Sequence, residues 1–531
     1  MIAAAQQAIA DGDTTLGIEL GSTRIKAVLI GPDHTALAAA SYSWENQYID
    51  RLWTYPLESV WTGLQECYAA LISDVQDRYA VPVTTLRALG VSAMMHGYLP
   101  FDADDQLLVP FRTWRNTNTG PAVEMLSEAF AYNIPHRWSI AHLHQAITNG
   151  EPHVHRIAHL TTLAGYVHEQ LTGQRVLGVG DASGMFPIDS ATATYDAAMV
   201  ATFDRLVADH ELPWRLADLL PIVRRAGEPA GTLTETGARR LDASGLLQPG
   251  MPLCPPEGDA GTGMVATNSV APRTGNVSAG TSIFAMVVLE QPLSRMHHAL
   301  DLVTTPAGDP VAMVHCNNGA SEISAWADLF AEFADLIGAN ADIAAVYQTL
   351  FRASLSGVPD CGGLLAYNYL SGEPITGLTD GRPMFLRSPD STFNLATFMR
   401  TQLFAVLGTL RIGMDVLQKD EGARLDTMYA HGGLFATKGV AQKYLAAAID
   451  TPVSVGATAA EGGAWGIAVL AAYQTRREPD QSLADYLQTE VFAAAQLAAV
   501  QPDPVDVAGF DAFMSRYVAA LPVQEAAANH F

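Results

Sequence analysis

Two short glycine turns carry residue types that can bind phosphate. Gly21-Ser22-Thr23 near the start and Gly280-Thr281-Ser282 past the middle each follow strand-like sequence. Their backbone N–H groups and hydroxyls can form an anion-binding concavity without a helix dipole. Either turn alone is a weak signal, because loops of Gly, Ser and Thr join strands in every protein. The pair predicts two lobes that hold one polyphosphate.

The first turn lies inside a predicted β-hairpin and not in a strand-to-helix phosphate loop. Residues 16–20 predict one strand and residues 25–30 predict the next. Residues 276–289 repeat this strand-turn-strand pattern after a break at residues 272–275. The chain therefore carries a short internal repeat, one copy at the head of each half.

Strand and helix signals alternate along the rest of the chain, as in an α/β protein. We expect a buried strand over residues 86–94, and an apolar, buried helix over residues 464–473. Further helices are expected over residues 53–79, 141–171, 196–250, 395–417 and 440–449, and in the tail from residue 481.

Composition narrows the class of protein. A chain of 531 residues exceeds one ordinary core, so two or more domains are expected. The net charge of −25 argues against nucleic-acid binding, because phosphate would be repelled. We expect no membrane partner and a cytoplasmic location, since the sequence shows neither a long apolar run nor a signal peptide, and its four cysteines are dispersed. A nucleotide substrate would need local cations, which Mg²⁺ can supply.

Seven short motifs, in this order, resemble the FGGY family of carbohydrate kinases. The resemblance runs from about residue 14 to about residue 475 and implies two actin/hexokinase-like (ribonuclease H-like) domains around an interdomain cleft. It implies a sugar-binding domain over residues 14–272 and an ATP-binding domain with a helical tail over residues 273–531. The motifs are Gly17-Ile18-Glu19-Leu20-Gly21-Ser22-Thr23-Arg24-Ile25-Lys26, Met94-Met95-His96-Gly97, Asp181-Ala182-Ser183-Gly184, Gly258-Asp259-Ala260-Gly261-Thr262-Gly263, Gly280-Thr281-Ser282, Gly432-Gly433 and Glu461-Gly462-Gly463-Ala464-Trp465-Gly466.

The resemblance implies a role for particular residues. Asp259 would accept the proton of the sugar hydroxyl and contact the metal; on local sequence alone, an Asp here is equally a helix N-cap. The sugar would be bound by Met95, His96, Trp114, Asp181 and Asp259. The phosphates and adenosine of ATP would be bound by Gly21, Ser22, Thr23, Lys26, Gly280, Thr281, Ser282, Gly432, Gly433, Gly462 and Gly463.

Two departures from the family pattern bear on the metal and the sugar. Glu19 stands where the family usually has Asp, so a metal contact through water would have a different geometry. Asn116 and Asn118 replace expected charged residues near Trp114. This change leaves the identity of the sugar open.

The sequence therefore predicts a kinase that uses ATP and Mg²⁺ to phosphorylate the terminal hydroxyl of an open-chain ketose. A pentulose is expected, with D-xylulose slightly favoured over L-ribulose by the Met95-His96-Gly97 segment. Two alternatives stay open: an actin-like ATPase or regulatory binding protein, and a sugar-binding pseudokinase. A homodimer is also left open.

Overall fold

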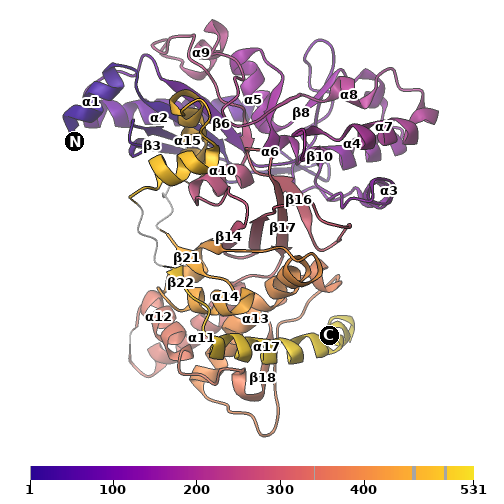
Figure 1. The fold of residues 1–531 in the computed structure, drawn as a ribbon, viewed down its shortest axis with the longest axis vertical. Coiled ribbons are helices and arrows are strands. Elements are labelled where there is room, and N and C mark those ends of the chain that lie inside the picture. Colours follow the sequence, from indigo (N-terminus) through magenta and orange to yellow (C-terminus); the bar gives the residue numbers. More distant parts are fainter. Residues whose placement is uncertain (1, 340, 457–461, 495–498, 531) are drawn as a thin grey trace. The chain divides into compact units, whose positions relative to one another are not determined.

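The computed structural model describes residues 2–339, 341–456, 462–494 and 499–530. The chain forms two compact units that each draw on several segments. One unit comprises residues 1–271, 302–311 and 458–495, and the other comprises residues 272–301, 312–457 and 496–531. Figure 1 shows the late helix α15 (Gly463–Arg476), in yellow, among the indigo and violet elements of the first unit.

The first unit is built on a five-stranded sheet of order β13-β6-β1-β2-β3. β1 pairs with β2 in antiparallel register, Gly17 opposite Val28, and with β6 in parallel register, Thr15 opposite Ala88. The predicted hairpin around residues 21–23 and the strand within residues 86–94 are thus confirmed. The strands are β1 (Thr15–Leu20), β2 (Arg24–Ile30), β3 (Ala36–Ser43), β6 (Ala88–Ala93) and β13 (Glu257–Gly258).

Helices cover both faces of this sheet, so β1 and β6 are buried along almost their whole length. α15 packs on β1 and β6, and α2 packs on β2 and β3. The predicted helix over residues 53–79 begins only at Leu57, because Trp53 belongs to a short hairpin strand. The helices are α1 (Ile2–Ala10), α2 (Leu57–Tyr79), α3 (Gly120–Phe130), α4 (Ser139–Thr148), α5 (Leu163–Thr172), α6 (Val179–Ala182), α7 (Ala197–Leu206), α8 (Leu216–Leu219), α9 (Glu235–Leu241), α10 (Asp259–Ala266), α15 and α16 (Leu483–Tyr486).

The remaining strands of the first unit are short and pair into two-stranded sheets. A strand interrupts the helices expected over residues 141–171, and another interrupts those expected over 196–250. They are β4 (Gln47–Ile49), β5 (Leu52–Thr54), β7 (Leu99–Phe101), β8 (His159–Thr161), β9 (Val176–Gly178), β10 (Ile188–Asp189), β11 (Thr194–Tyr195) and β12 (Ile222–Arg224).

A seven-stranded sheet of order β16-β17-β15-β14-β20-β21-β22 repeats the pattern of the first. β14 pairs with β15 in antiparallel register around the turn at 280–282, and with β20 in parallel register. The internal repeat predicted from the sequence is therefore a repeat of structure. The strands are β14 (Thr274–Ala279), β15 (Ile283–Val288), β16 (Asp301–Thr304), β17 (Pro310–Cys316), β20 (Thr427–His431), β21 (Val453–Val455) and β22 (Ala499–Val500).

The second unit holds the long helix that was expected over residues 395–417. It runs as α13 (Leu395–Asp415) and continues into a π-helical turn at Val416–Asp420. The other elements are α11 (Ser321–Leu336), α12 (Ile343–Ser354), α14 (Ala441–Ile449), α17 (Pro504–Ala519), α18 (Leu521–His530) and the hairpin strands β18 (Leu364–Tyr367) and β19 (Met384–Arg387). Among the described residues, no helix is both long and apolar enough to cross a bilayer.

Candidate active site

Asp259 lies where two parallel strands of the first unit end. It is the first residue of α10, directly after β13, and Gly258 occupies the N-cap position before it. Its Oδ1 accepts the backbone N–H of Met95 at 3.2 Å, just beyond the end of β6. The carboxylate is therefore tied to the neighbouring strand, and the residue remains exposed to solvent.

The surroundings of Asp259 suit a proton acceptor. Although the residue is exposed, the protein atoms gathered around its carboxylate reduce its hydration, and this raises its pKa. Hydrogen bonds from the N–H groups of Met95 and Ala260 oppose this rise, as does the positive charge of Arg137. A carboxylate with a raised pKa is a better base toward a hydroxyl than an ordinary surface aspartate.

Glu19 lies near Asp259, on β1. It faces Lys26 across the hairpin, and a Cβ atom on Gly463 would come within 2.1 Å of its Oε1. The pKa of Glu19 is raised to about 7, mainly by burial and also by the negative charge of Asp259. The charge of Lys26 and a hydrogen bond from the N–H of Ala464 partly oppose this rise. Two repelling carboxylates are a donor set that suits a hard cation such as Mg²⁺, which would relieve the repulsion.

His96 follows β6 in a conformation that few bulky residues adopt. Its φ is +70°, and the φ of Gly97 is +107°. Such strain persists only where surrounding structure holds it, often at functional sites. The ring lies nearly parallel to that of Trp138, at 18°, with centroids 6.4 Å apart.

The hydrogen bond of His96 defines its tautomer. Nδ1 lies 3.1 Å from the carbonyl oxygen of Gly184, which can only accept, so Nδ1 carries the proton. Burial, helped by the charge of Arg137, lowers the pKa of His96 well below its ordinary value. The neutral ring therefore keeps Nε2 as an acceptor, which suits a sugar hydroxyl.

Asp181 is a buried carboxylic acid on α6, 1% exposed. Its Oδ2 accepts the hydroxyl of Thr162 at 2.6 Å, while Oδ1 has no hydrogen-bond partner among the described residues. Burial raises its pKa to about 7, and the charge of Asp259 adds to the effect. The structure thus brings Asp181, Asp259, His96 and Glu19 into one part of the first unit.

Three aromatic side chains hold the glycine turn of the first unit. The indole of Trp44 donates to Gly21 O at 2.8 Å, and the hydroxyl of Tyr55 donates to Ser22 O at 2.6 Å. The indole of Trp114 donates to Ser22 Oγ at 3.2 Å. Trp114, predicted to bind the sugar, therefore contacts a residue predicted to bind phosphate.

Asn116, one of the departures near Trp114, holds the backbone of the adjoining hairpin. Its Oδ1 accepts the N–H of Trp53 at 2.9 Å, and its Nδ2 donates to Trp53 O at 2.8 Å. The residue is buried, at 4% exposed. These two hydrogen bonds to the backbone of β5 explain why an asparagine is found at position 116, without any contact to a sugar.

A cavity of about 410 Å³ lies within the second unit. Gly280 and Thr281 of the second glycine turn line it together with Gly433 and Thr437. Ser282 closes the turn through its carbonyl, which accepts the N–H of Gly280 at 3.0 Å. Predicted phosphate and adenosine residues thus border one cavity of a size that suits a small-molecule ligand.

The same cavity has walls that sequence analysis missed. α11 contributes Ser321 and Ser324, and α12 contributes Tyr347, Gln348 and Phe351. Tyr347 and Phe351 lie four residues apart on one helix face, which in sequence resembles an ordinary core stripe. Arg137 and Glu257 in the first unit were missed as well, because neither is part of a motif, although Glu257 directly precedes the one that begins at Gly258.

Gly432 and the glycines before α15 have different surroundings. Gly432 has a φ of +106°, and a Cβ atom there would lie 2.3 Å from Ala279 O, so only glycine fits. Gly462 and Gly463 belong to the first unit, where Gly463 packs against Glu19. Glu461 lies outside the described residues.

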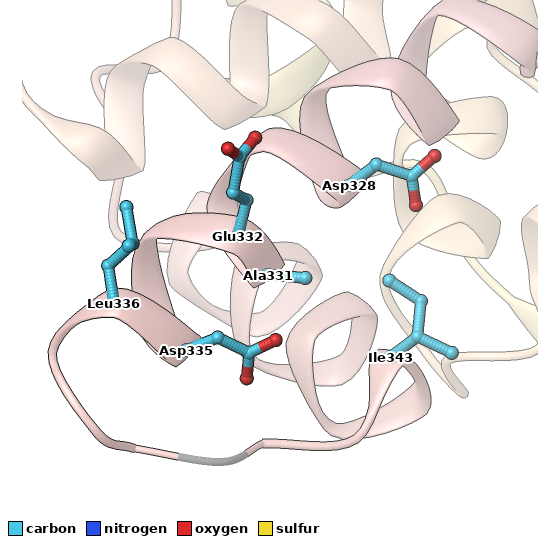
Figure 2. Close-up of a pocket in the computed structure, with 6 residues that line it drawn as sticks. All are labelled: Asp328, Ala331, Glu332, Asp335, Leu336 and Ile343. Carbon is cyan, nitrogen blue, oxygen red and sulfur yellow. The ribbon is translucent and has the colours of Figure 1, made fainter.

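A larger hollow of about 700 Å³ opens at the surface between the end of α11 and the start of α12. Asp328, Glu332 and Asp335 place their carboxylates around it, beside Leu336 and Ile343 (Figure 2). An acidic, open rim repels phosphate groups. This hollow is therefore a poorer nucleotide site than the smaller cavity.

Family models match nearly the whole chain. The N-terminal domain of the FGGY family of carbohydrate kinases matches residues 14–261, and its C-terminal domain matches residues 275–475. The chain belongs to the FGGY family of carbohydrate kinases. The resemblance stated from the motifs is thereby confirmed.

Individual FGGY proteins match at low identity. Xylulose kinase of Escherichia coli (strain K12) is 23% identical over 293 residues, which span 54% of this chain and 56% of that protein, about half of each. The structure of xylulose kinase from Rhodospirillum rubrum matches with a TM-score of 0.78 and 20% identity, covering 96% of this chain and 99% of that one. Gluconate kinase from Lactobacillus acidophilus matches with a TM-score of 0.77 and 16% identity, covering 97% and 99%.

These structural matches confirm the predicted fold class, with two actin/hexokinase-like domains. Two kinases named for different substrates match almost equally well. The fold by itself therefore does not select the sugar.

The raised pKa of Asp181 predicts a pH-dependent stability for this FGGY protein. Because the folded state holds the proton up to about pH 7 and the unfolded state releases it near 3.8, wild-type stability falls as pH rises through this window. The Asp181→Asn variant has no titrating group at this position. The free energy of unfolding of this variant should therefore rise relative to that of wild type by about 2–3 kcal/mol as the pH increases from 5 to 8. Urea unfolding of both proteins at the two pH values measures this, and parallel pH profiles would contradict it.

Proposed function

We propose that the protein transfers the γ-phosphoryl group of ATP to the terminal hydroxyl of an open-chain ketose, a pentulose such as D-xylulose or L-ribulose. The observation that carries this proposal is the placement of Asp259. It stands at the end of β13 beside Met95, with Glu19, Asp181 and His96 around it. Ligands of α/β sheets bind beyond the carboxyl ends of parallel strands, where these residues lie.

Asp259 takes the proton of the attacking hydroxyl. Phosphoryl transfer requires little covalent chemistry from the protein, so a positioned carboxylate and charge stabilisation suffice. Its exposed carboxylate can reach a substrate, and its raised pKa favours proton transfer. His96, neutral and held by Gly184, accepts a hydrogen bond from another hydroxyl of the sugar through Nε2.

The carboxylates of the first unit and the cavity of the second unit support the ATP side of the proposed reaction. Glu19 and Asp259 would hold Mg²⁺, which neutralises charge on the phosphates when it is bound. Gly280, Thr281 and Gly433 would bind ATP in the cavity of the second unit. A functional division into a sugar-binding domain at 14–272 and an ATP-binding domain at 273–531 remains a prediction.

Lys26 and the turn at residues 21–23 would complete the phosphate path from the first unit. Lys26 lies opposite Glu19 in the hairpin and lowers the pKa of that carboxyl. The aromatic clamp on Gly21 and Ser22 keeps the turn rigid, which reduces the entropy lost on binding an anion. Gly462 and Gly463 would contact ATP next to Glu19.

ADP release with a panel of pentuloses, hexuloses, polyols and aldonates tests the proposed function. We expect one pentulose to raise turnover far above the rate with ATP alone. ATP hydrolysis that no sugar changes would favour the actin-like ATPase. Sugar binding without ADP release from any member of the panel would favour the pseudokinase.

His96→Ala should weaken ketose binding by about 1–3 kcal/mol, because a sugar hydroxyl loses its buried acceptor. ATP affinity in the absence of sugar should stay unchanged. Calorimetric titration of each ligand separately measures both effects. Equal losses of ATP and ketose affinity would show that His96 supports the fold and not the sugar.

A further inference from the structure

The carboxylate of Glu257 caps a helix that belongs to another segment of the first unit. Its Oε2 accepts the N–H of Asp181 at 2.9 Å, and its Oε1 accepts the N–H of Gly180 at 3.3 Å. These are among the first N–H groups of α6, which find no acceptor inside a helix. The N-cap residue of α6 is Gly178, which has no side chain for the task. Glu257 supplies the missing acceptor from β13.

Two glycines at the start of α6, one at its N-cap and one within it, make room for this carboxylate. A Cβ atom on Gly178 would lie 2.2 Å from Glu257 Oε1, and one on Gly180 would lie 2.4 Å from Oε2. Gly178 has φ −64° and ψ 148°, which any residue can adopt. Backbone conformation therefore does not demand glycine at this position, whereas the volume of the carboxylate does, together with the Pro256 carbonyl oxygen 2.7 Å from such a Cβ atom. Gly178, Gly180 and Glu257 form a matched set.

This set joins the two segments that carry the candidate active-site groups. Glu257 is 1% exposed, pairs with Ser92 of β6, and lies two residues before Asp259. α6 carries Asp181, and the turn after it brings the Gly184 carbonyl to His96. The cap thus links the segment of the proposed base to the segment that holds the sugar-binding groups.

We propose that Glu257 is a positioning residue that holds Asp181 and His96 in register with Asp259. The inference rests on the proposed function, since it concerns the alignment of substrate with base. Glu257 itself touches no substrate in this role. Its loss leaves α6 attached through Thr304, whose hydroxyl donates to Val179 O at 3.0 Å, and leaves the side chain of Asp181 bonded to the Thr162 hydroxyl at 2.6 Å. It removes the acceptor of the Gly180 and Asp181 N–H groups, so the backbone of this turn can shift.

Glu257→Ala should therefore lower kcat by about 10–100-fold, because displacement of about 1 Å in aligned groups has an effect of this size. Glu257→Gln keeps one acceptor and should recover part of the loss. Asp242→Ala is the matched control. Asp242 is also a buried carboxylate in the first unit, and it accepts the N–H groups of Ser244 at 2.9 Å and Leu247 at 2.8 Å.

The control separates positioning from general stability. Asp242→Ala should lose stability as Glu257→Ala does but keep kcat within about twofold at a temperature where both are folded, since the side-chain hydrogen bonds of Asp242 stay within its own turn at residues 242–247. Equal losses of kcat in the two variants would reduce Glu257 to a structural residue. A folded Glu257→Ala protein with wild-type kcat would overturn the proposal outright.

A double-mutant cycle tests the contact geometry. Gly180→Ala places a methyl group against Glu257 Oε2 and should lower kcat by itself. In the Glu257→Ala background that space is vacated, so Gly180→Ala should add little further loss. Fully additive losses would contradict the matched set.

Hydrogen exchange provides a readout that does not depend on turnover. Glu257→Ala should speed exchange of the Gly180 and Asp181 amides by about tenfold or more, whereas Asp242→Ala should leave them protected. Absence of sugar phosphorylation by the wild-type protein would refute the proposed function. Hydrogen exchange would then still test whether Glu257 holds the Gly180 and Asp181 amides. Unchanged protection of both amides in Glu257→Ala would refute the positioning role.

Discussion

Asp259→Asn should lower kcat by about 10²–10⁴-fold, the usual loss when a general base is removed. Asparagine keeps the size of the side chain and can still accept the N–H of Met95, so the loss arises from proton acceptance. Ketose binding should survive, because the sugar retains its contacts with the remaining groups. Steady-state kinetics with the best ketose, together with calorimetric titration, measure the two quantities.

Asp196→Asn is a suitable control for the effect of Asp259→Asn on the fold. Asp196 caps α7 in the same unit and accepts the N–H of Met199 at 2.9 Å. Its replacement should change stability slightly and kcat not at all. An Asp259→Asn protein that turns over as fast as wild type would remove Asp259 from the role of base.

Gly433→Trp should raise the Kd for ATP by about 10–100-fold, because the indole would occupy the cavity of the second unit. Steric conflict between the indole and bound ATP should weaken binding by about 1–3 kcal/mol. A Cβ atom on Gly433 meets no other atom within 4 Å, so the fold should accept the larger residue. Ketose binding without ATP should be unchanged. Separate titrations of ATP and ketose check both expectations.

Gly433→Ala provides the matched control, since a methyl group occupies little of a cavity of about 410 Å³. Its ATP affinity should stay within about twofold of wild type. Normal ATP affinity in the tryptophan variant would move the nucleotide away from this cavity. A parallel loss of ketose affinity would show a disturbed fold.

Local patterns were sufficient for most of the secondary structure. The strand-like sequence on both sides of Gly21-Ser22-Thr23 and of Gly280-Thr281-Ser282 predicted both hairpins, and the apolar run at residues 464–473 predicted the buried helix α15. These features depend on neighbours in sequence, which set strand pairing and helix periodicity. The start of α2 was placed too early, because Trp53 pairs with Tyr48 in a hairpin that propensity alone does not reveal.

Some of the candidate site residues could be predicted from the sequence, and others could not. Asp259, His96, Glu19 and the glycine turns stood out through motif order, and the structure gathers the first three within one unit. Glu257, Arg137 and the cavity wall at Tyr347 and Phe351 carried no such signal. Their importance arises from residues distant in sequence, as when the carboxylate of Glu257 reaches back to the N–H of Asp181.

The sequence by itself determined the family, the repeated hairpins and the residue types available for phosphoryl transfer. Tertiary structure decided their electrostatic states: it placed Glu19 against Asp259 and Gly463, buried Asp181, and fixed the tautomer of His96 through Gly184. The physical reason is that pKa values and hydrogen-bond roles depend on burial and on nearby charges, which exist only once distant segments have packed together.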